Sequence, residues 1–322
     1  MPADINMATP PVPPSPGVTA VVVTYHPDPA TLAAQVKCLA GQVERLLLVD
    51  NGSGNAAEIA ALAGEYDWVE FIGAGSNRGL GWAHNEGIRR GLADGADAIL
   101  LLDQDSLPRS GMVAALARAL VGQCQRGVQV AAVGARYLGS DIGHPSYFVQ
   151  FRPLRFRHHF CTGNDAGEII PADMLISSGA LFPREALLEL GLMDEGLFID
   201  HIDTEWFLRA KDRGWRVFGV CDAVMDHGLG ERTVMVWLGR WRYLPVHQPF
   251  RYYYIYRNSV LLYRRSYPSR RWKYTDMLRL AKMFVVFSLF AGNRRQNLRM
   301  MCRGLADGFK GRSGPIDADL PR

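Results

Sequence analysis

The stretch that most constrains the fold is residues 98–106 (AILLLDQDS), where an apolar run ends abruptly in two carboxylates. Residues 98–102 are all apolar, which is typical of a strand buried on both faces. Ligands of open α/β sheets bind beyond the carboxyl ends of the strands, and alternate residues of an extended chain point the same way. Asp103 and Asp105 are therefore predicted to face one crevice.

Two carboxylates at one strand end repel each other unless a cation lies between them. Hard oxygen ligands suit Mg²⁺ or Mn²⁺, with water and substrate phosphates in the remaining coordination positions. We therefore predict a divalent cation at Asp103 and Asp105. The alternative is an Asp/Ser turn that closes a strand and binds nothing.

Neighbouring segments repeat a strand–helix pattern and predict an α/β fold. Residues 18–25 and 45–49 are apolar runs separated by a helical stripe, which predicts a right-handed βαβ unit. The ends of both strands, Tyr25 and Asp50, then share one edge with Asp103. An Asp at that edge can accept hydrogen bonds from a base or a ribose, although Asp-Asn-Gly is also an ordinary turn.

Two further segments are candidates for substrate contact. Asn77 and Arg78 lie in a glycine-bearing loop before a predicted helix at 82–92, where they could lie along a nucleotide; a plain surface loop is the alternative. Ser178 and Gly179 lie within a predicted strand at 172–182, where small side chains leave room for a sugar ring. Residues 140–170 show no clear period and are expected to pass over the site.

A second acidic cluster begins a predicted helix that continues to Gly214. Asp203 and Glu205 fall in its first turn, where acids complement the helix dipole, so capping is the simplest role for them. The cluster contains more acids than a cap requires. His227 follows the last predicted strand of this part, and a lone histidine is usually packed or on the surface.

Charge divides the chain near Glu231. Residues 232–322 hold 19 Lys/Arg against 4 Asp/Glu, whereas residues 1–231 hold 17 against 28. The basic part also carries 16 of the 33 aromatic residues. We predict a disordered arm at 1–17, a catalytic domain at 18–231 and a helical region at 232–322.

The basic region is expected to associate with an anionic membrane surface. Its apolar stretch, residues 278–290, is shorter than the ~20 residues that a membrane span requires, so it predicts a helix that lies in the interface. Nucleic acid is not expected, because no RNP, helix-turn-helix or zinc pattern accompanies the charge. The alternative is an appendage that packs on the catalytic domain or forms a homodimer.

The five cysteines are odd in number and scattered, and they form no CxxC pair. This pattern predicts neither a disulfide framework nor a zinc site, and it favours a reducing, cytosolic compartment. No secretory signal is recognisable at the N-terminus.

Five motifs in this order resemble the family 2 inverting glycosyltransferases, over roughly residues 18–230. They are VVTY (22–25), LVDNGS (48–53), NRG followed by NEGI (77–79, 85–88), DQDS (103–106) and DTEWFLR (203–209). The forms LDQDS and IDHIDTEW resemble the bacterial rhamnosyltransferase branch.

This resemblance implies a GT-A fold, a nucleotide-sugar donor and a divalent cation. By this resemblance Asp50 would bind the nucleobase, and Asp103 would bind the ribose or a metal-bound water. Asp105 and His227 would bind the metal. Asp203 takes the position of the general base. Donor contacts are expected from the remaining residues of these motifs and from the small-residue segment: Thr24, Tyr25, Asn77, Arg78, Gln104, Ser178 and Gly179.

One position departs from the family pattern, in which many members carry Glu-Asp where this chain has Ile202-Asp203. A helper carboxylate must therefore come from Glu205 or be absent. The function expected is transfer of L-rhamnose from dTDP-β-L-rhamnose to a lipid-linked or polysaccharide acceptor, at the cytoplasmic face of the inner membrane. The alternatives are transfer of another sugar, or a non-catalytic nucleotide-sugar or glycan binder.

Overall fold

The computed structural model describes residues 17–139, 147–152, 155–161, 167–227, 232–237, 241–289 and 293–316. The predicted N-terminal arm lies outside this part, except for Gly17.

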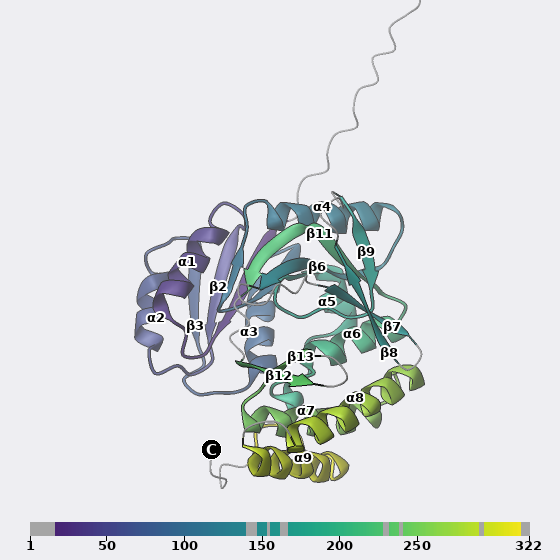
Figure 1. The fold of residues 1–322 in the computed structure, drawn as a ribbon. Helices are drawn as coiled ribbons and strands as arrows, with labels where there is room; N and C mark the ends of the chain where they lie inside the picture. Colours follow the sequence, from purple (N-terminus) through teal and green to yellow (C-terminus); the bar gives the residue numbers. More distant parts are fainter. Residues whose placement is uncertain are drawn as a thin grey trace, which may run out of the picture.

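A mixed sheet forms the centre of the molecule, with the strand order β3-β2-β1-β4-β10-β6-β11-β5 and β9 paired to β11 (Figure 1). The strands are β1 (Val18–Thr24), β2 (Arg45–Asp50), β3 (Val69–Gly73), β4 (Ala98–Asp103), β5 (Ser106–Pro108), β6 (Val130–Gly139), β9 (Ile169–Ala172), β10 (Ala180–Pro183) and β11 (Arg216–His227). The predicted α/β fold is confirmed.

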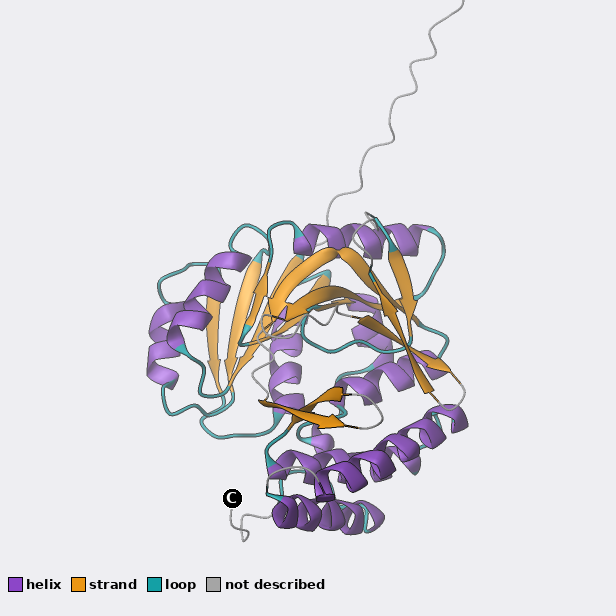
Figure 2. Cartoon of the chain, viewed as in Figure 1, coloured by secondary structure: helices purple, strands orange, loops and turns teal. Residues whose placement is uncertain are grey.

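Two helical layers cover the sheet (Figure 2). The helices are α1 (Pro29–Leu39), α2 (Ala56–Ala63), α3 (Leu80–Ala93), α4 (Met112–Gln125), α5 (Arg184–Leu190) and α6 (Ile202–Asp212). Alternate residues of β1 show how the strands serve both layers. Val21 and Val23 pack with α3 and α6, whereas Ala20 and Val22 pack with α1 and α4. Burial on both faces explains the unbroken apolar runs in the sequence.

Parallel pairing sets the strand ends at one edge. In β1, Thr24 pairs with Asp50 of β2, and Val23 pairs with Asp103 of β4. Antiparallel pairing of β11 with β5 brings His227 opposite Ser106, directly after Asp105. The register therefore gathers the sequence-predicted polar residues along one side of the sheet.

The C-terminal region forms a separate layer at the bottom of Figure 1. It contains a hairpin of β12 (Arg232–Trp237) and β13 (Trp241–Val246), followed by α7 (Pro249–Tyr263), α8 (Arg270–Leu289) and α9 (Arg294–Phe309). Tyrosines of α7 and methionines of α9 form its own apolar cluster. Within the described residues, none of the helices has the length and apolar character needed to cross a bilayer.

Three expectations about local structure are wrong. Two antiparallel strands, β7 (Tyr147–Arg152) and β8 (Arg155–Phe160), lie where no period was recognised. Residues 173–179 are irregular, so Ser178 and Gly179 lie in a turn and not in a strand. Cys161 and Cys221 form a disulfide across 60 residues, because the pairing of β9 with β11 brings their segments together. The prediction that the cysteines form no disulfide is therefore wrong, and the expectation of a reducing compartment rested on it.

Candidate active site

The loop after β4 is held by buried side chains. The Gln35 side chain donates to the carbonyls of Asp103 (2.7 Å) and Ser106 (2.6 Å). Ser178 Oγ accepts from the amide of Asp103 (3.0 Å) and lies 2.7 Å from Ser106 Oγ. The side chains of Asp103 and Asp105 are partly exposed at this fixed turn. A rigid backbone thus presents both carboxylates at the sheet edge.

Gln104, between the two acids, ties β4 to the end of β1. Its side-chain oxygen accepts from the Tyr25 amide at 2.7 Å, and its side-chain nitrogen donates to the Tyr25 carbonyl at 3.4 Å. The Tyr25 ring is 44% exposed at this edge. Tyr25 therefore offers a flat surface beside the acidic turn, the kind of surface on which a nucleobase stacks.

Asp50 shapes its own loop. Its carboxylate accepts from Thr24 Oγ1 (3.1 Å), from the amides of Gly52 (3.1 Å) and Ser53 (2.9 Å), and from the Ser53 hydroxyl. These four donors match the four lone-pair positions of a carboxylate. Contact between Asp50 and a base, as predicted, requires one of these bonds to be exchanged.

The predicted nucleotide loop lies beside that of Asp50. Asn51 donates to Asn77 Oδ1 (3.2 Å) and accepts from the Arg78 amide (2.9 Å). The Arg78 guanidinium, 4.1 Å above the Trp82 ring, is exposed on the same side. This exposed cation is therefore accessible to an anionic ligand.

Asp203 at the start of α6 has a raised pKa. Burial, with smaller contributions from the charges of Asp200 and Asp103, raises the pKa of this carboxyl to about 6. The charge of Asp103 is thus close enough to Asp203 to act on its pKa. The Thr204 amide donates to Asp203 Oδ1 at 2.7 Å and fixes the carboxylate.

The loop before Asp203 is strained, because Phe198, Asp200 and His201 all have positive φ (66°, 62° and 62°). Such conformations cost of order 1–3 kcal/mol each in non-glycine residues and persist only where surrounding contacts determine them. The contacts here come from α7. Asn258 donates to the carbonyls of Leu197 (3.0 Å), Ile199 (2.9 Å) and Asp200 (2.9 Å).

Two arginines of the same helix also bind this loop. The Arg257 guanidinium donates to the Leu197 carbonyl at 2.9 Å, and Arg251 pairs with the Asp200 carboxylate at 2.6 Å. Arg257 and Asn258 are both 0% exposed. Sequence reasoning missed these residues. The available signal was two polar residues that interrupt an aromatic run, YYYIYRNS at 252–259.

Glu205 does not serve as the predicted helper. Its carboxylate is 1% exposed and bound by Arg209, by Arg265 (3.2 Å) and by the Tyr267 hydroxyl. Two residues along a helix from Asp203, its side chain points to another face. Glu205 therefore joins α6 to the segment after α7 as a structural ion pair.

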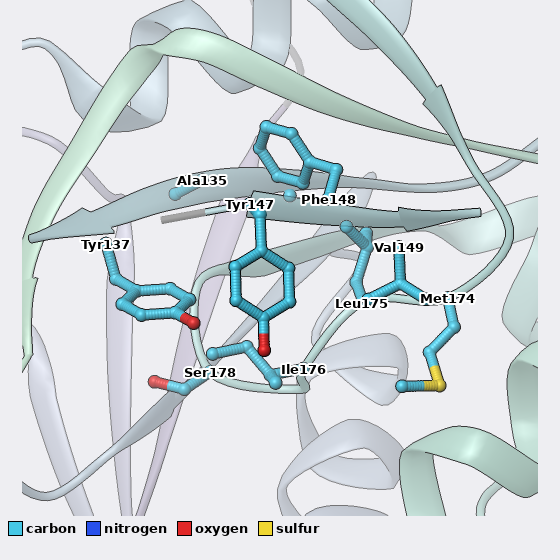
Figure 3. A pocket seen from close by; sticks show the side chains of 10 residues that line it. Ala135, Tyr137, Tyr147, Phe148, Val149, Met174, Leu175, Ile176 and Ser178 are labelled. Atoms are coloured by element: carbon cyan, nitrogen blue, oxygen red, sulfur yellow. The ribbon is translucent and has the colours of Figure 1, made fainter. Parts of the chain in front are cut away.

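The room predicted beside Gly179 is filled. Gly179 has φ +79° in a tight turn, and an added Cβ would lie 2.8 Å from the sulfur of Met225. Ser178 instead lines a small cavity of about 120 Å³ with the rings of Tyr137 and Tyr147 (Figure 3). Burial raises the pKa of Tyr137 to about 12, so its hydroxyl stays protonated. The open space in this segment therefore lies beside Ser178 and not beside Gly179.

The donor set at the edge fits a hard divalent cation in type: two carboxylates on one turn, with His227 at the end of the neighbouring strand. The side chain of His227 lies outside the described residues. Among side chains that the structure does describe, no three His, Cys, Asp or Glu residues form a ready metal set. Water and donor phosphates would supply the remaining ligands.

Comparison with known proteins agrees with this geometry. The model for "Glycosyl transferase family 2" matches residues 19–191. The dTDP-rhamnosyl transferase RfbF of Shigella flexneri is 33% identical over 253 residues, 78% of this chain and 81% of that protein. The galactofuranosyltransferase GlfT1 of Mycobacterium tuberculosis is 29% identical over 249 residues, 75% of this chain and 80% of that protein.

Solved structures show the same GT-A fold. TarS 1–349 of S. aureus in complex with UDP-GlcNAc superposes with a TM-score of 0.57 at 13% identity, covering 91% of this chain and 80% of that chain. GalNAc-T7 with UDP, GalNAc and Mn²⁺ gives 0.54 at 15% identity, covering 66% and 44%. With the family model and RfbF matching the part that bears the acidic turn, the chain belongs to glycosyl transferase family 2.

Proposed function

We propose that this glycosyltransferase moves L-rhamnose from dTDP-β-L-rhamnose to a hydroxyl of a lipid-linked or polysaccharide acceptor. The observation that supports the chemistry is the raised pKa of Asp203, to which the charge of Asp103 in the acidic turn contributes. The sugar rests on the similarity to RfbF.

In the proposed reaction Asp203 accepts the proton of the acceptor hydroxyl. That oxygen bonds to the anomeric carbon as the bond to the diphosphate breaks, so a β-linked donor gives an α-L-rhamnoside. A carboxyl whose pKa is about 6 is ionised at neutral pH and still basic. General-base assistance contributes about 10²–10⁴ in rate.

The donor is proposed to lie along the edge from Tyr25 to the acidic turn. Tyr25 and the loop of Asp50 would contact the nucleoside, and Arg78 the diphosphate. A divalent cation held by Asp103, Asp105 and His227 would neutralise the charge of the departing diphosphate.

The donor is tested with a panel of nucleotide sugars. We expect dTDP-L-rhamnose with Mn²⁺ to raise the melting temperature most and to be hydrolysed fastest in the absence of acceptor. A larger response to a UDP-furanose would move the assignment toward the galactofuranosyl relative. Binding without any turnover, with or without acceptor glycans, would favour a non-catalytic binder.

We further propose peripheral attachment through the basic region, at the cytoplasmic face of the inner membrane. The support is its charge, since only two acids, Asp276 and Asp307, occur between residues 249 and 316, and both are buried. Flotation with phosphatidylglycerol vesicles tests this attachment, and light scattering tests the alternative of a homodimer.

A further inference from the structure

A groove between α7, α8 and α9 has no part in the site described above. It encloses about 640 Å³, within the range of pockets that hold one small molecule. Its lining residues are apolar or aromatic with one exception: Tyr256, Val260, Tyr263, Arg264, Met277, Leu280, Ala281, Phe284, Val285, Leu305 and Phe309. The three helices that form it lie at the bottom of Figure 2.

The groove offers almost nothing to a polar ligand. The Tyr256 hydroxyl donates to the Leu280 carbonyl at 2.7 Å, and the Tyr263 hydroxyl donates to Asp276 at 2.7 Å. With both hydroxyls engaged inside the helices, the tyrosines present ring surface to the groove. A sugar or a nucleotide would lose hydrogen bonds to water there and regain few.

The rim remains in solvent, although it is apolar. Met277 is 42% exposed, Val285 53% and Phe309 73%, whereas Val260 and Leu280 at the floor are below 6%. An exposed apolar concavity of this size marks a binding surface more often than a packing defect. A hydrocarbon chain laid in the groove would cover both floor and rim.

The charge around the groove selects an anionic head group. Residues 249–316 contain fifteen Lys/Arg and two Asp, and both acids are buried in ion pairs with Arg279 and with Arg303. The exposed charge of these helices is therefore cationic. Arg264 lines one end of the groove, where it donates to the Phe309 carbonyl at 3.1 Å, and Lys310 is exposed next to it.

We propose that this groove binds the hydrocarbon chain of the lipid-linked acceptor, with the phosphate of that lipid near Arg264. The inference deepens the proposed function and rests on it, since it names where the acceptor's lipid is held. A concave groove suits one chain, whereas a bilayer surface needs a flat or convex apolar face.

The groove also lies against the helix that holds the loop of the base. Tyr256, Val260 and Tyr263 form one stripe of α7, and Arg257 and Asn258 beside them hold residues 196–200. A lipid in the groove would thus fix the acceptor to the same rigid element that fixes Asp203.

Titration of the full-length protein with farnesyl phosphate, below its critical micelle concentration, tests the proposal. Ala281→Trp fills the groove and Val285→Glu puts a charge in it; both positions are exposed, so folding should survive, which melting temperature checks. Leu278→Trp and Leu278→Glu are matched controls, because Leu278 is 45% exposed on α8 but does not line the groove.

We expect saturable binding that weakens at least about tenfold in both groove variants and is unchanged in both controls. Farnesol should bind more weakly than farnesyl phosphate, and inorganic phosphate should not compete at equal concentration. Phosphatidylglycerol vesicles should bind the groove variants as well as wild type.

Absence of saturable binding would overturn the proposal. If the Leu278 variants lose farnesyl phosphate binding to the same extent as the groove variants, the surface binds the bulk membrane and not a single chain. If the protein is a dimer that farnesyl phosphate dissociates, the groove is covered by a second copy of the chain. Thermal stabilisation by dTDP-L-rhamnose with Mn²⁺, measured on the same samples, reports the proposed function separately. If dTDP-L-rhamnose with Mn²⁺ does not stabilise the wild-type protein, the proposed function is contradicted. The lipid titration can still be interpreted in that case.

Discussion

At the scale of single residues, the raised pKa of Asp203 lowers the folding stability at neutral pH. The unfolded chain ionises this carboxyl near pH 4, whereas burial holds its pKa at about 6 in the folded protein. Folding stability is therefore lost as pH rises from about 4 to 6 and stays lower above it. Asp203→Asn should be more stable than wild type at pH 7.5, by about 2 kcal/mol, with no difference at pH 4.

Urea titrations of both proteins at the two pH values measure this difference. Donor binding by Asp203→Asn should match wild type, which shows that the variant is folded and that its site is intact. Equal stability of the two proteins at pH 7.5 would contradict a buried, ionised Asp203.

His84 predicts the opposite slope. This residue of α3 is 1% exposed and neither ring nitrogen has a hydrogen-bond partner; burial lowers its pKa to about 4. The unfolded chain takes up this proton near pH 6.5, so the contribution of His84 to stability is lost as pH falls from 6.5 to 4. His84→Leu should remove about 3 kcal/mol of acid sensitivity over that window.

Denaturant midpoints measured at intervals from pH 4 to 7 test this. A pH slope in His84→Leu equal to that of wild type would show that the pKa of this histidine is the same in the folded protein as in the unfolded chain.

Asp105 tests the predicted cation site by itself. Asp105→Asn should raise the Mn²⁺ concentration needed for half-maximal donor hydrolysis by at least about tenfold, because an amide is a poorer ligand than a carboxylate. Chelator should abolish hydrolysis in wild type. Hydrolysis that survives chelator would contradict the assignment of the acidic turn to a metal.

Some features of the candidate site could be predicted from the sequence, and others could not. The acidic turn was visible because a buried strand has no packing reason to end in DQD. The saturation of Asp50 and the pairing of Glu205 with Arg265 were not visible, because they depend on partners fixed only by tertiary packing.

At the scale of elements, α7 holds the loop before Asp203, and the proposed function makes it the element that positions the base. Asn258→Ala removes three hydrogen bonds to the strained loop before Asp203. A shift of about 1 Å in a reacting group costs of order 10²-fold, so kcat for donor hydrolysis should fall by about that factor with the donor KM unchanged.

Tyr256→Phe is the matched control for Asn258→Ala. It removes a buried hydrogen bond of α7, to the Leu280 carbonyl of α8 at 2.7 Å, and this bond does not involve the loop before Asp203. Its kcat should stay within about twofold of wild type. If the loss of kcat in both variants follows the decrease in their melting temperatures, α7 has a purely structural role.

Strands and helices were predictable to the degree that burial imposed a period. Strands β1, β2 and β4, buried on both faces, and the amphipathic helices between them were found within a few residues. The hairpin β7–β8 was missed because its strands have mixed burial and no alternation. The turn at Gly179 was missed because its reason, Met225 packed against the glycine, lies on a distant strand.

At the scale of the whole molecule, the division of charge near Glu231 did not reveal that the C-terminal helices contact the loops before α6. The ion pairs of Arg251 with Asp200 and of Arg265 with Asp194 join the basic helices to the acidic loops of the catalytic part. Part of the basic charge therefore serves an interface within the molecule. The disulfide of Cys161 and Cys221 was hidden for the same reason, since 60 residues separate its ends.

The central claim is that Asp203, beside the acidic turn, is the base of a rhamnosyl transfer. Its most direct test is the pH dependence of kcat/KM for dTDP-L-rhamnose hydrolysis or transfer with Mn²⁺ present. The account predicts a rate that rises with pH through an apparent pKa near 6, and a residual rate in Asp203→Asn that lacks this limb and is at least about 10²-fold lower. A wild-type profile flat from pH 5 to 8, or the same limb in Asp203→Asn, would contradict it.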